Sequence, residues 1–389
     1  MTTYRLMTPG PVPIPEEVLE VLARPMEHHR TPEFIALFGR VLANLKKVFQ
    51  TSEACFLQTS TGSGGMESAL VNTLSPGDHV LSIVSGKFGE RWAEMAEAFG
   101  LRVTRLEVEW GRAVRVNDVE DALKKNPEIR AVMTQACETS TGVLHPVREL
   151  AQITRDSKAI LIVDAITALG AVPLPMDEWG VDVIIGGSQK AFMLPTGLSF
   201  ISFSKKAWAL VEKSKMPKFY FDIRAEKAAN ENGESLFSSA VTHVRALDLV
   251  LDIFLMRGMH KVHERIDALS RASIEAAREM GLKIFSEIAS PSVTALAMPE
   301  GLDGQKVRAD MEKTSHVIVM GGQDRLKGKI IRIGNMGAIR DEDLLVTLEA
   351  LATSLNRAKP GTVPDERMQA GLARAKEILN ATPAVVLKG

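Results

Sequence analysis

Residues 159–190 read AILIVDAITALGAVPLPMDEWGVDVIIGGSQK and contain two apolar runs that indicate the class of fold. These runs, AILIV and VDVII, show little polar alternation, which is typical of strands covered by helices on both faces. Asp164 follows the first run, and Lys190 follows the second after two glycines. The two residues are 26 positions apart, about one strand–helix–strand unit, so we expect them at the ends of neighbouring strands. Ligands bind at that edge of an open α/β sheet.

Neither residue indicates a function by itself. Burying a lysine is costly unless its charge is paired or lost, and Lys190 could simply extend its ammonium group to water. Asp164 could cap a following helix. The choice therefore depends on what the rest of the chain brings to the same edge.

Short apolar runs and amphipathic stretches alternate over the first half of the chain. This alternation predicts an α/β fold with a mainly parallel seven-stranded sheet and helices on both faces. The predicted strands are 54–58, 79–84, 102–108, 130–135, 159–165, 181–187 and 198–204. Helical patterns lie between most of them, at 66–74, 90–99, 117–125 and 146–156.

The pattern changes near Ser238, where the sequence becomes strongly helical. Two later apolar runs, SVTALAMP and KIIRIGNMG, are separated by an amphipathic stretch, which predicts a smaller α+β domain. The chain length also favours two domains. The expected parts are an N-terminal arm (1–14), a large α/β domain (15–259), a small α+β domain (260–357) and a linker with a C-terminal helix (358–389).

Composition excludes several classes of protein. A net charge of −1 gives no bulk attraction to nucleic acid or to an anionic membrane. No run of 18 apolar residues predicts a membrane span, and the first residues lack the apolar core of a secretory signal. Cys55 and Cys137 are too few for a disulfide framework, lack metal-site spacing and fit a reducing compartment. We therefore expect a cytoplasmic protein without a structural metal.

Two further features could bind anions. TSTGSGGMES, from Thr59 to Ser68, follows a strand and opens a helix, so free N–H groups and the hydroxyls of Thr61 and Ser63 favour a phosphate. It is neither a Walker loop nor a GxGxxG fingerprint, and an ordinary glycine-rich turn is the alternative. Arg332, inside the apolar KIIRIG, suits a carboxylate ligand, although a structural ion pair would also explain it.

These four features are individually weak, but together they specify one cofactor. A phosphate cradle, an aspartate for a pyridinium nitrogen and a lysine able to form an imine are what pyridoxal phosphate requires. The aspartate keeps the ring nitrogen protonated, which makes the ring an electron sink. The sequence therefore predicts a pyridoxal-phosphate enzyme.

Five motifs also resemble a known family in their order and spacing. They are STGSGGMESAL, ETSTGVLHP, LIVDAITALG, GGSQKAFMLPTGLSF and IRIGNMG. Over residues 5–357 the sequence resembles the class V aminotransferases of fold type I, and is most similar to the alanine–glyoxylate and serine–glyoxylate (serine–pyruvate) group. The resemblance implies a homodimer with active sites near the subunit interface.

The resemblance also implies individual roles. Lys190 would bind the cofactor covalently, Asp164 would pair with its ring nitrogen, and Arg332 would bind the substrate α-carboxylate, approached also by the backbone of Gly10. Other residues would surround the cofactor: Thr61, Gly62, Ser63 and Gln189 at the phosphate, Phe88 and Ile166 against the ring, and either Thr139 or Ser140 near the ring oxygen.

One position departs from the family pattern. Many relatives carry a tyrosine and, three residues later, a threonine that reach the neighbouring subunit's phosphate. Here Ser238 can replace the threonine, but Ser235 stands where the tyrosine is expected. This departure weakens the expected contact between subunits.

The implied activity is a ping-pong transamination from a small amino acid, alanine or serine, to glyoxylate or pyruvate. The alternatives are a transaminase for another small amine donor, such as a phosphonate, or a homologue that no longer transaminates and serves as a subunit. Cysteine desulfurases share the fold class but need a nucleophilic cysteine in the C-terminal half, whereas both cysteines here precede residue 140.

Overall fold

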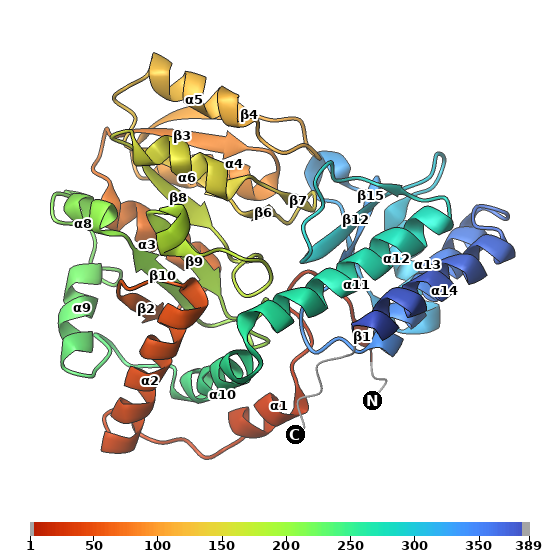
Figure 1. The fold of residues 1–389 in the computed structure, drawn as a ribbon, viewed down its shortest axis with the longest axis horizontal. Coiled ribbons are helices and arrows are strands. Elements are labelled where there is room, and N and C mark those ends of the chain that lie inside the picture. Colours follow the sequence, from red (N-terminus) through yellow and green to blue (C-terminus); the bar gives the residue numbers. More distant parts are fainter. Residues whose placement is uncertain (1–3, 383–389) are drawn as a thin grey trace.

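The seven predicted strands form a single mixed sheet in the computed structural model, which describes residues 4–382. The strand order is β2-β10-β9-β8-β5-β3-β4 (Figure 1). All neighbours are parallel except β10, which is antiparallel to both β9 and β2. The prediction of a mainly parallel α/β sheet is therefore confirmed. The bounds are β2 Cys55–Gln58, β3 His79–Val84, β4 Arg102–Glu107, β5 Ala131–Gln135, β8 Ile160–Asp164, β9 Val183–Gly187 and β10 Ser199–Phe203.

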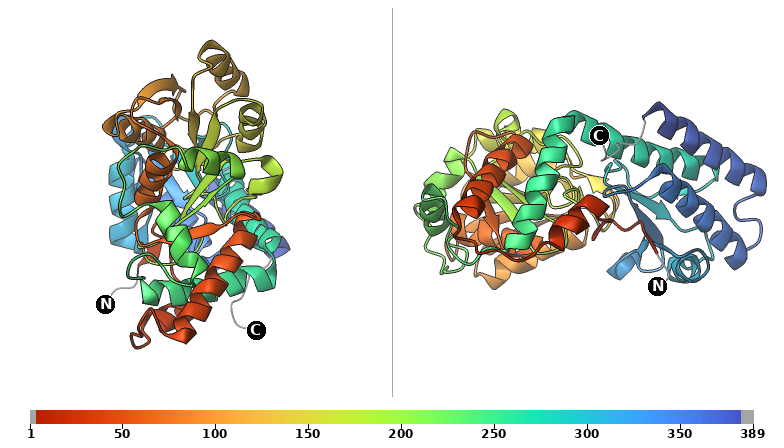
Figure 2. Two further views of the ribbon diagram at one scale, coloured as in Figure 1. Left: turned by 90° about the vertical axis from the view of Figure 1, so that its left-hand side faces the viewer. Right: turned by 90° about the horizontal axis from the view of Figure 1, so that it is seen from below.

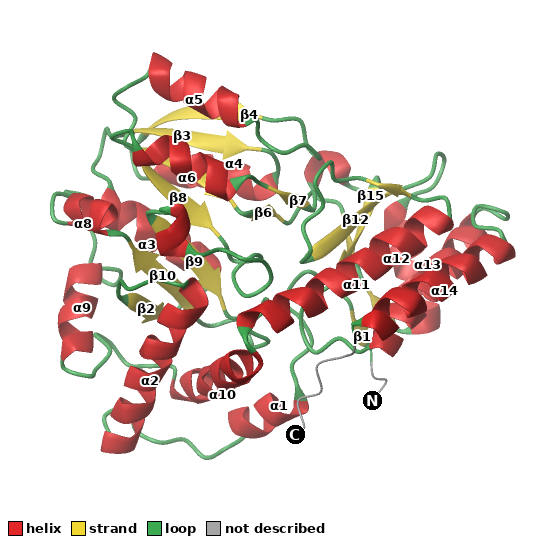
Figure 3. Ribbon diagram, viewed as in Figure 1, coloured by secondary structure: helices red, strands yellow, loops and turns green. Residues whose placement is uncertain are grey.

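Helices cover both faces of this sheet because alternate strand residues point to opposite sides (Figure 3). Met133 and Ile162 belong to the core beneath one set of helices, α3 (Gly62–Thr73), α4 (Lys87–Ala98) and α8 (Lys205–Val211). Val132 and Leu161 belong to the core on the opposite face. The helices there are α2 (Pro32–Phe49), α5 (Val116–Lys125), α6 (Val147–Arg155) and α10 (Val241–Arg257).

A second body lies beside the large sheet (Figure 2, right). It is built on four antiparallel strands in the order β11-β12-β15-β14. Its strands are β11 Lys283–Ile284, β12 Val293–Ala297, β14 Met320–Gly321 and β15 Ile330–Gly334. Its helices are α11 Met259–Glu279, α12 Gly304–Ser315, α13 Asp341–Ala358 and α14 Asp365–Ala381. The C-terminal helix α14 shares the core of this body, since Ala375 and Leu379 pack with Leu269 of α11.

The N-terminal arm connects the two bodies. Its short strand β1 (Arg5–Leu6) pairs in parallel with β13 (Val317–Ile318) of the second body. The chain then crosses to α1 (Glu16–Leu22), whose Val18 packs in the core of the large body. The arm therefore spans the junction at which the large sheet ends. The remaining elements are β6 Cys137–Glu138, β7 Val143–Leu144, α7 Met176–Trp179, α9 Ile223–Glu231 and the 3-10 helix η1 Asp324–Leu326.

The glycine-rich segment differs from the prediction, because α3 begins at Gly62 rather than at residue 66. The segment opens a helix, as expected, and its glycines permit close packing of that helix. A Cβ atom on Gly62 would lie 2.4 Å from Ile166 Cδ1, and one on Gly65 would lie 2.7 Å from Ile185 Cγ2. Between residues 4 and 382, the helices include none with the length and apolar character needed to cross a membrane.

Candidate functional site

Lys190 and Asp164 lie at the edge where the parallel strands end, as their spacing predicts. Asp164 is the last residue of β8, and its Cα pairs with that of Ile185 in the neighbouring strand β9. Lys190 follows three residues after β9 ends at Gly187. Both side chains are buried, with 6% of Asp164 and 9% of Lys190 exposed.

Burial changes the acid–base character of this pair. Loss of hydration lowers the pKa of Lys190 to about 8, although the carboxylate of Asp164 opposes the change. Burial raises the pKa of Asp164 to about 6, and the backbone N–H of Ile166, which donates to Asp164 Oδ1 at 2.9 Å, acts against this rise. At neutral pH the lysine is thus close to releasing its proton, while the aspartate is largely ionised.

The N-terminal arm closes over Lys190. The Lys190 ammonium donates a hydrogen bond of 2.7 Å to the carbonyl oxygen of Pro9. Gly10, with a φ of +136°, presses against the same side chain: a Cβ atom there would lie 2.3 Å from Lys190 Nζ. A side chain at position 10 would therefore displace the amine, which explains the need for glycine at this point of the arm.

Thr61, Gly62 and Ser63 lie at the N-terminus of α3, where Thr61 is the residue preceding the first helical turn. Arg91 of α4 donates to Ser63 Oγ at 3.1 Å, so a cation lies beside the helix N-terminus. Gln189 has a buried Oε1 atom that lacks a hydrogen-bond partner among the described residues. Helix N–H groups, two hydroxyls and a guanidinium together form a site suited to an anion.

Phe88 is fixed through an acid that the sequence analysis missed. The carboxylate of Glu138, in β6, accepts hydrogen bonds from the backbone N–H groups of Phe88, Gly89 and Ser140. Burial raises the pKa of Glu138, and these hydrogen bonds oppose that rise. The Arg91 guanidinium lies 4.9 Å from the centre of the Phe88 ring.

Sequence analysis missed both Arg91 and Glu138, although each has a feature that is visible in the sequence. Arg91 lies three positions after Phe88, so the two share a helix face. Glu138 is an acid among apolar and small residues. Either feature was visible, but neither indicated its partner.

Thr139 and Ser140 now differ in their surroundings. Ser140 Oγ donates to Glu138 Oε1 at 2.6 Å and accepts from the N–H of Lys87 at 2.9 Å. Thr139 Oγ1 instead donates to Thr167 Oγ1 at 2.8 Å. Ser140 is therefore committed to positioning α4. Thr139 instead pairs with Thr167, three residues after Asp164, whose hydroxyl hydrogen can still be donated.

Arg332 connects the second body to this site. It lies on β15 with 3% of its surface exposed, and burial lowers its pKa to about 10. Its Nη2 and Nε atoms donate to Gly321 O at 2.7 and 3.0 Å, and Nη1 donates to Thr139 O at 2.8 Å. Because a guanidinium has five N–H donors, hydrogens remain for a carboxylate.

Ser238 lies beside the end of strand β2. It lines a small hollow of about 30 Å³ with Gln58, Thr59 and Tyr220, while Ser235 Oγ donates to Phe237 O at 2.7 Å. Lys190 does not line this hollow. Gln58 and Thr59 closely precede the Thr61–Ser63 segment, so this lining places Ser238 near the start of α3.

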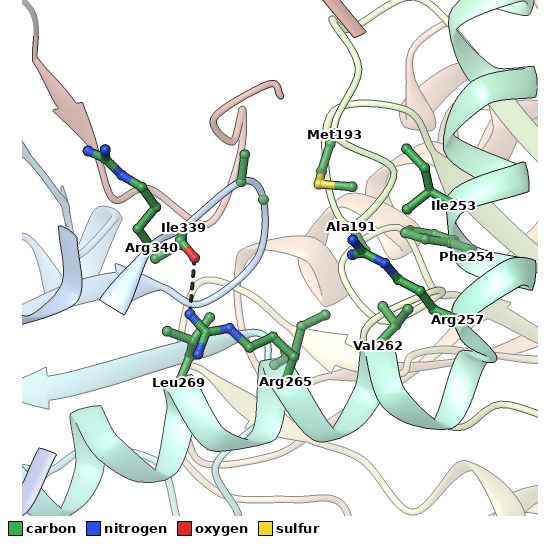
Figure 4. A pocket seen from close by; sticks show the side chains of 13 residues that line it. Ala191, Met193, Ile253, Phe254, Arg257, Val262, Arg265, Leu269, Ile339 and Arg340 are labelled. Atoms are coloured by element: carbon green, nitrogen blue, oxygen red, sulfur yellow. Dashed lines mark hydrogen bonds between the residues drawn. The ribbon is translucent and has the colours of Figure 1, made fainter. Parts of the chain in front are cut away.

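A larger apolar cavity of about 340 Å³ lies near the junction of α10 and α11 (Figure 4). Ala191 and Met193 form one wall, and Arg265, which donates to Ile339 O at 3.2 Å, lies on another. Lys190, Asp164 and Arg332 do not line it. The strand-end residues Lys190 and Asp164, and Arg332 beside them, therefore lie outside this cavity.

The residues at the strand ends fit pyridoxal phosphate. The helix N-terminus with Arg91 suits the phosphate, and buried Asp164 suits a protonated ring nitrogen. Lys190 has the lowered pKa that a nucleophilic amine needs. Within residues 4–382, no group of three or more His, Cys, Asp or Glu side chains could hold a metal ion.

Comparisons with known proteins agree with this site. The model of the family aminotransferase class-V matches residues 16–334. The soluble hydrogenase 42 kDa subunit of Anabaena cylindrica is 38% identical over 90% of this chain and 92% of its own. The L-aspartate–glyoxylate aminotransferase of Paracoccus denitrificans is 35% identical over 98% of each chain. The crystal structure of ureidoglycine–glyoxylate aminotransferase from Bacillus subtilis superposes with a TM-score of 0.90 at 29% identity, covering 97% of this chain and 99% of that one.

The family match covers most of the large body and reaches β15, which carries Arg332. The similarity therefore includes both halves of the strand-end site rather than a single motif. The chain belongs to the class V aminotransferases, enzymes of fold type I whose cofactor is pyridoxal 5′-phosphate.

Proposed function

We propose that this aminotransferase transfers the amino group of a small amino acid to a small 2-oxo acid at the strand-end site. The observation that carries the proposal is the buried amine of Lys190, whose pKa is lowered to about 8 beside the strand that ends in Asp164. An amine with this pKa can act as a nucleophile and as a base near neutral pH. Arg332 adds a cation for the substrate carboxylate.

Each residue of the site has a separate role in the proposed reaction. The bound cofactor supplies a reactive aldehyde and an electron-withdrawing ring. Asp164 keeps the ring nitrogen protonated, and the N-terminus of α3 with Arg91 holds the phosphate. Arg332 orients the substrate through its α-carboxylate. The Lys190 amine accepts the substrate's α-proton and holds it at Nζ for return.

The proposed donor is alanine or serine, and the proposed acceptor is glyoxylate or pyruvate. Glyoxylate is supported by the names of two similar proteins, one acting on aspartate and one on ureidoglycine. A two-stage reaction in which the first product leaves before the second substrate binds predicts ping-pong kinetics.

A second candidate, a donor with an anionic side chain such as a phosphonate or aspartate, is favoured by a separate observation. Arg332 lines a hollow of about 320 Å³ with Lys87, Arg308, Lys327 and a single carboxylate, Asp324. Arg308 has a buried Nε atom without a partner among the described residues, and its charge helps to lower the pKa of Arg332. An anion between these guanidiniums would relieve their repulsion.

One relative is named as a hydrogenase subunit, and that name would support a role without transamination. Against that role, Lys190 and Asp164 are buried at the strand ends, and Arg332 is buried on β15 beside them. A cysteine desulfurase role is disfavoured, because Cys55 and Cys137 are both buried, and burial raises the pKa of Cys55 to about 12. The side chains therefore support an active transaminase.

We also propose a cytoplasmic homodimer. Two buried, unpaired cysteines suit a reducing compartment. The family pattern, in which a hydroxyl at the position of Ser238 reaches the neighbouring subunit's phosphate, supports the homodimer.

Replacing Lys190 by alanine tests the proposed function. The wild-type protein reconstituted with pyridoxal phosphate should show a visible absorption band that changes when L-alanine, L-serine or L-aspartate is added. Lys190→Ala should lose both the band and turnover, because the variant lacks the buried amine beside Asp164. Lys205→Ala, at an exposed lysine of α8, is the control and should keep both. Normal turnover by Lys190→Ala would contradict the proposal.

A further inference from the structure

Gln135 is a buried side chain that the chemistry described above leaves unexplained. It is the last residue of β5 and is 0% exposed. Neither its Oε1 nor its Nε2 atom has a hydrogen-bond partner among residues 4–382. An unpaired buried polar group costs about 1–3 kcal/mol, so an amide with two such atoms suggests that a partner is absent until a ligand binds.

The sheet places Gln135 directly beside Asp164. Their Cα atoms are partners in the parallel ladder between β5 and β8. Met133 and Ile162, two residues earlier on each strand, pack in the core beneath α3 and α4. Because strand side chains alternate, Gln135 and Asp164 point to that same face. A Cβ atom on Gly89 of α4 would lie 3.4 Å from Gln135 Nε2, which places the amide between the strand ends and the start of α4.

The two acidic residues near this amide differ in their need for a donor. Glu138 already accepts N–H groups from Phe88, Gly89 and Ser140 and the hydroxyl of Ser140. Asp164 accepts a single N–H, that of Ile166, among the described residues. A carboxylate has about four lone-pair sites, so Asp164 retains capacity after pairing with a ring nitrogen.

We propose that Gln135 is a positioning residue for Asp164: its Nε2 donates to the Asp164 carboxylate when the cofactor is bound. The terminal torsion of glutamine is broad, so the amide can turn toward Asp164 without moving the strand. A donated hydrogen bond favours the ionised carboxylate and fixes its direction toward the ring nitrogen. This inference rests on the proposed function, because it requires that Asp164 pairs with the cofactor ring.

The test compares two probes, pyridoxal phosphate and its 1-deaza analogue, in which carbon replaces the ring nitrogen. Gln135→Met keeps a similar shape but has no amide, and replacing both unpartnered atoms by apolar ones should not prevent folding. Dissociation constants for the apo-protein are measured by equilibrium dialysis with both probes. Gln135→Met should weaken pyridoxal phosphate binding by about 10- to 100-fold, the range for a hydrogen bond to a charged group, and change deaza-analogue binding less than about twofold.

The outcomes separate a positioning role from a packing role. Equal weakening of both probes, or no weakening of either, would show that Gln135 does not act through the ring nitrogen and would overturn the inference. Gln135→Glu provides a second variant, which should weaken pyridoxal phosphate binding selectively because an acceptor replaces the donor beside Asp164. If wild-type protein fails to bind pyridoxal phosphate, the proposed function fails as well; if it binds and both variants bind equally, this inference alone is wrong.

Discussion

The burial of Lys190 predicts that the apo-protein is less stable than it would be without this amine. In Lys190→Met, an apolar side chain of similar length replaces the ammonium group. Lys190 is almost fully buried, and its pKa falls from the ordinary 10.5 to about 8, chiefly through lost hydration. The charged form is thus disfavoured in the folded protein, and the methionine side chain should be better accommodated.

The magnitude follows from the pKa difference between the folded and unfolded chains. A difference of about 2.5, at 1.36 kcal/mol for each unit of pKa, corresponds to about 3 kcal/mol. Between about pH 8 and 10.5 the unfolded chain binds more protons at this lysine than the folded chain does. The free energy of unfolding of the wild type therefore rises with pH across this window.

The assay is urea unfolding of both apo-proteins at pH 7 and at pH 10. Effects of other titrating groups cancel in the difference between the two proteins. Lys190→Met should be more stable than wild type at pH 7, and its advantage should shrink by about 2–3 kcal/mol at pH 10. The lost hydrogen bond to Pro9 O reduces the advantage at both pH values alike, by about 1 kcal/mol.

Lys125→Met is the matched control, because Lys125 lies exposed on α5. Its effect on stability should stay within about 0.5 kcal/mol at both pH values. A stability difference between Lys190→Met and wild type that is the same at pH 7 and pH 10 would contradict this prediction. It would mean that the folded protein accommodates the lysine charge as readily as water does.

Two further predictions concern the supports of the site. Arg332→Lys should reduce kcat/KM by about 10- to 100-fold, mainly by raising the KM for the amino donor, since lysine cannot reproduce a two-point contact with a carboxylate; steady-state kinetics with an unchanged KM would contradict the assigned contact. Gly89→Ala should lower the free energy of unfolding by about 1–3 kcal/mol, because its Cβ would lie 2.5 Å from the backbone oxygen of Ile83. Urea unfolding measures this effect, and Gly39→Ala, on α2 with open space around it, is the control that should not be destabilised.

The positions of the strands along the chain were largely predictable from the sequence. Seven apolar runs gave the seven strands, because burial on both faces leaves a local pattern that can be read along the chain. The spacing of Asp164 and Lys190 likewise placed them on neighbouring strand ends. The start of α3 was predicted four residues late, because glycines that look like a turn locally are required for packing against Ile166 and Ile185.

Contacts between distant segments were decided by the tertiary structure. Pro9 and Gly10 contact Lys190 across 180 residues, Glu138 ties down the start of α4, and Arg332 reaches Thr139 from the other body. None of these pairs has a periodic signal, since the contacts depend on how the arm and second body close over the sheet. Sequence alone determined which groups stand at the strand ends, because local burial sets the strands; the fold decided what surrounds them, because those neighbours are joined only through packing.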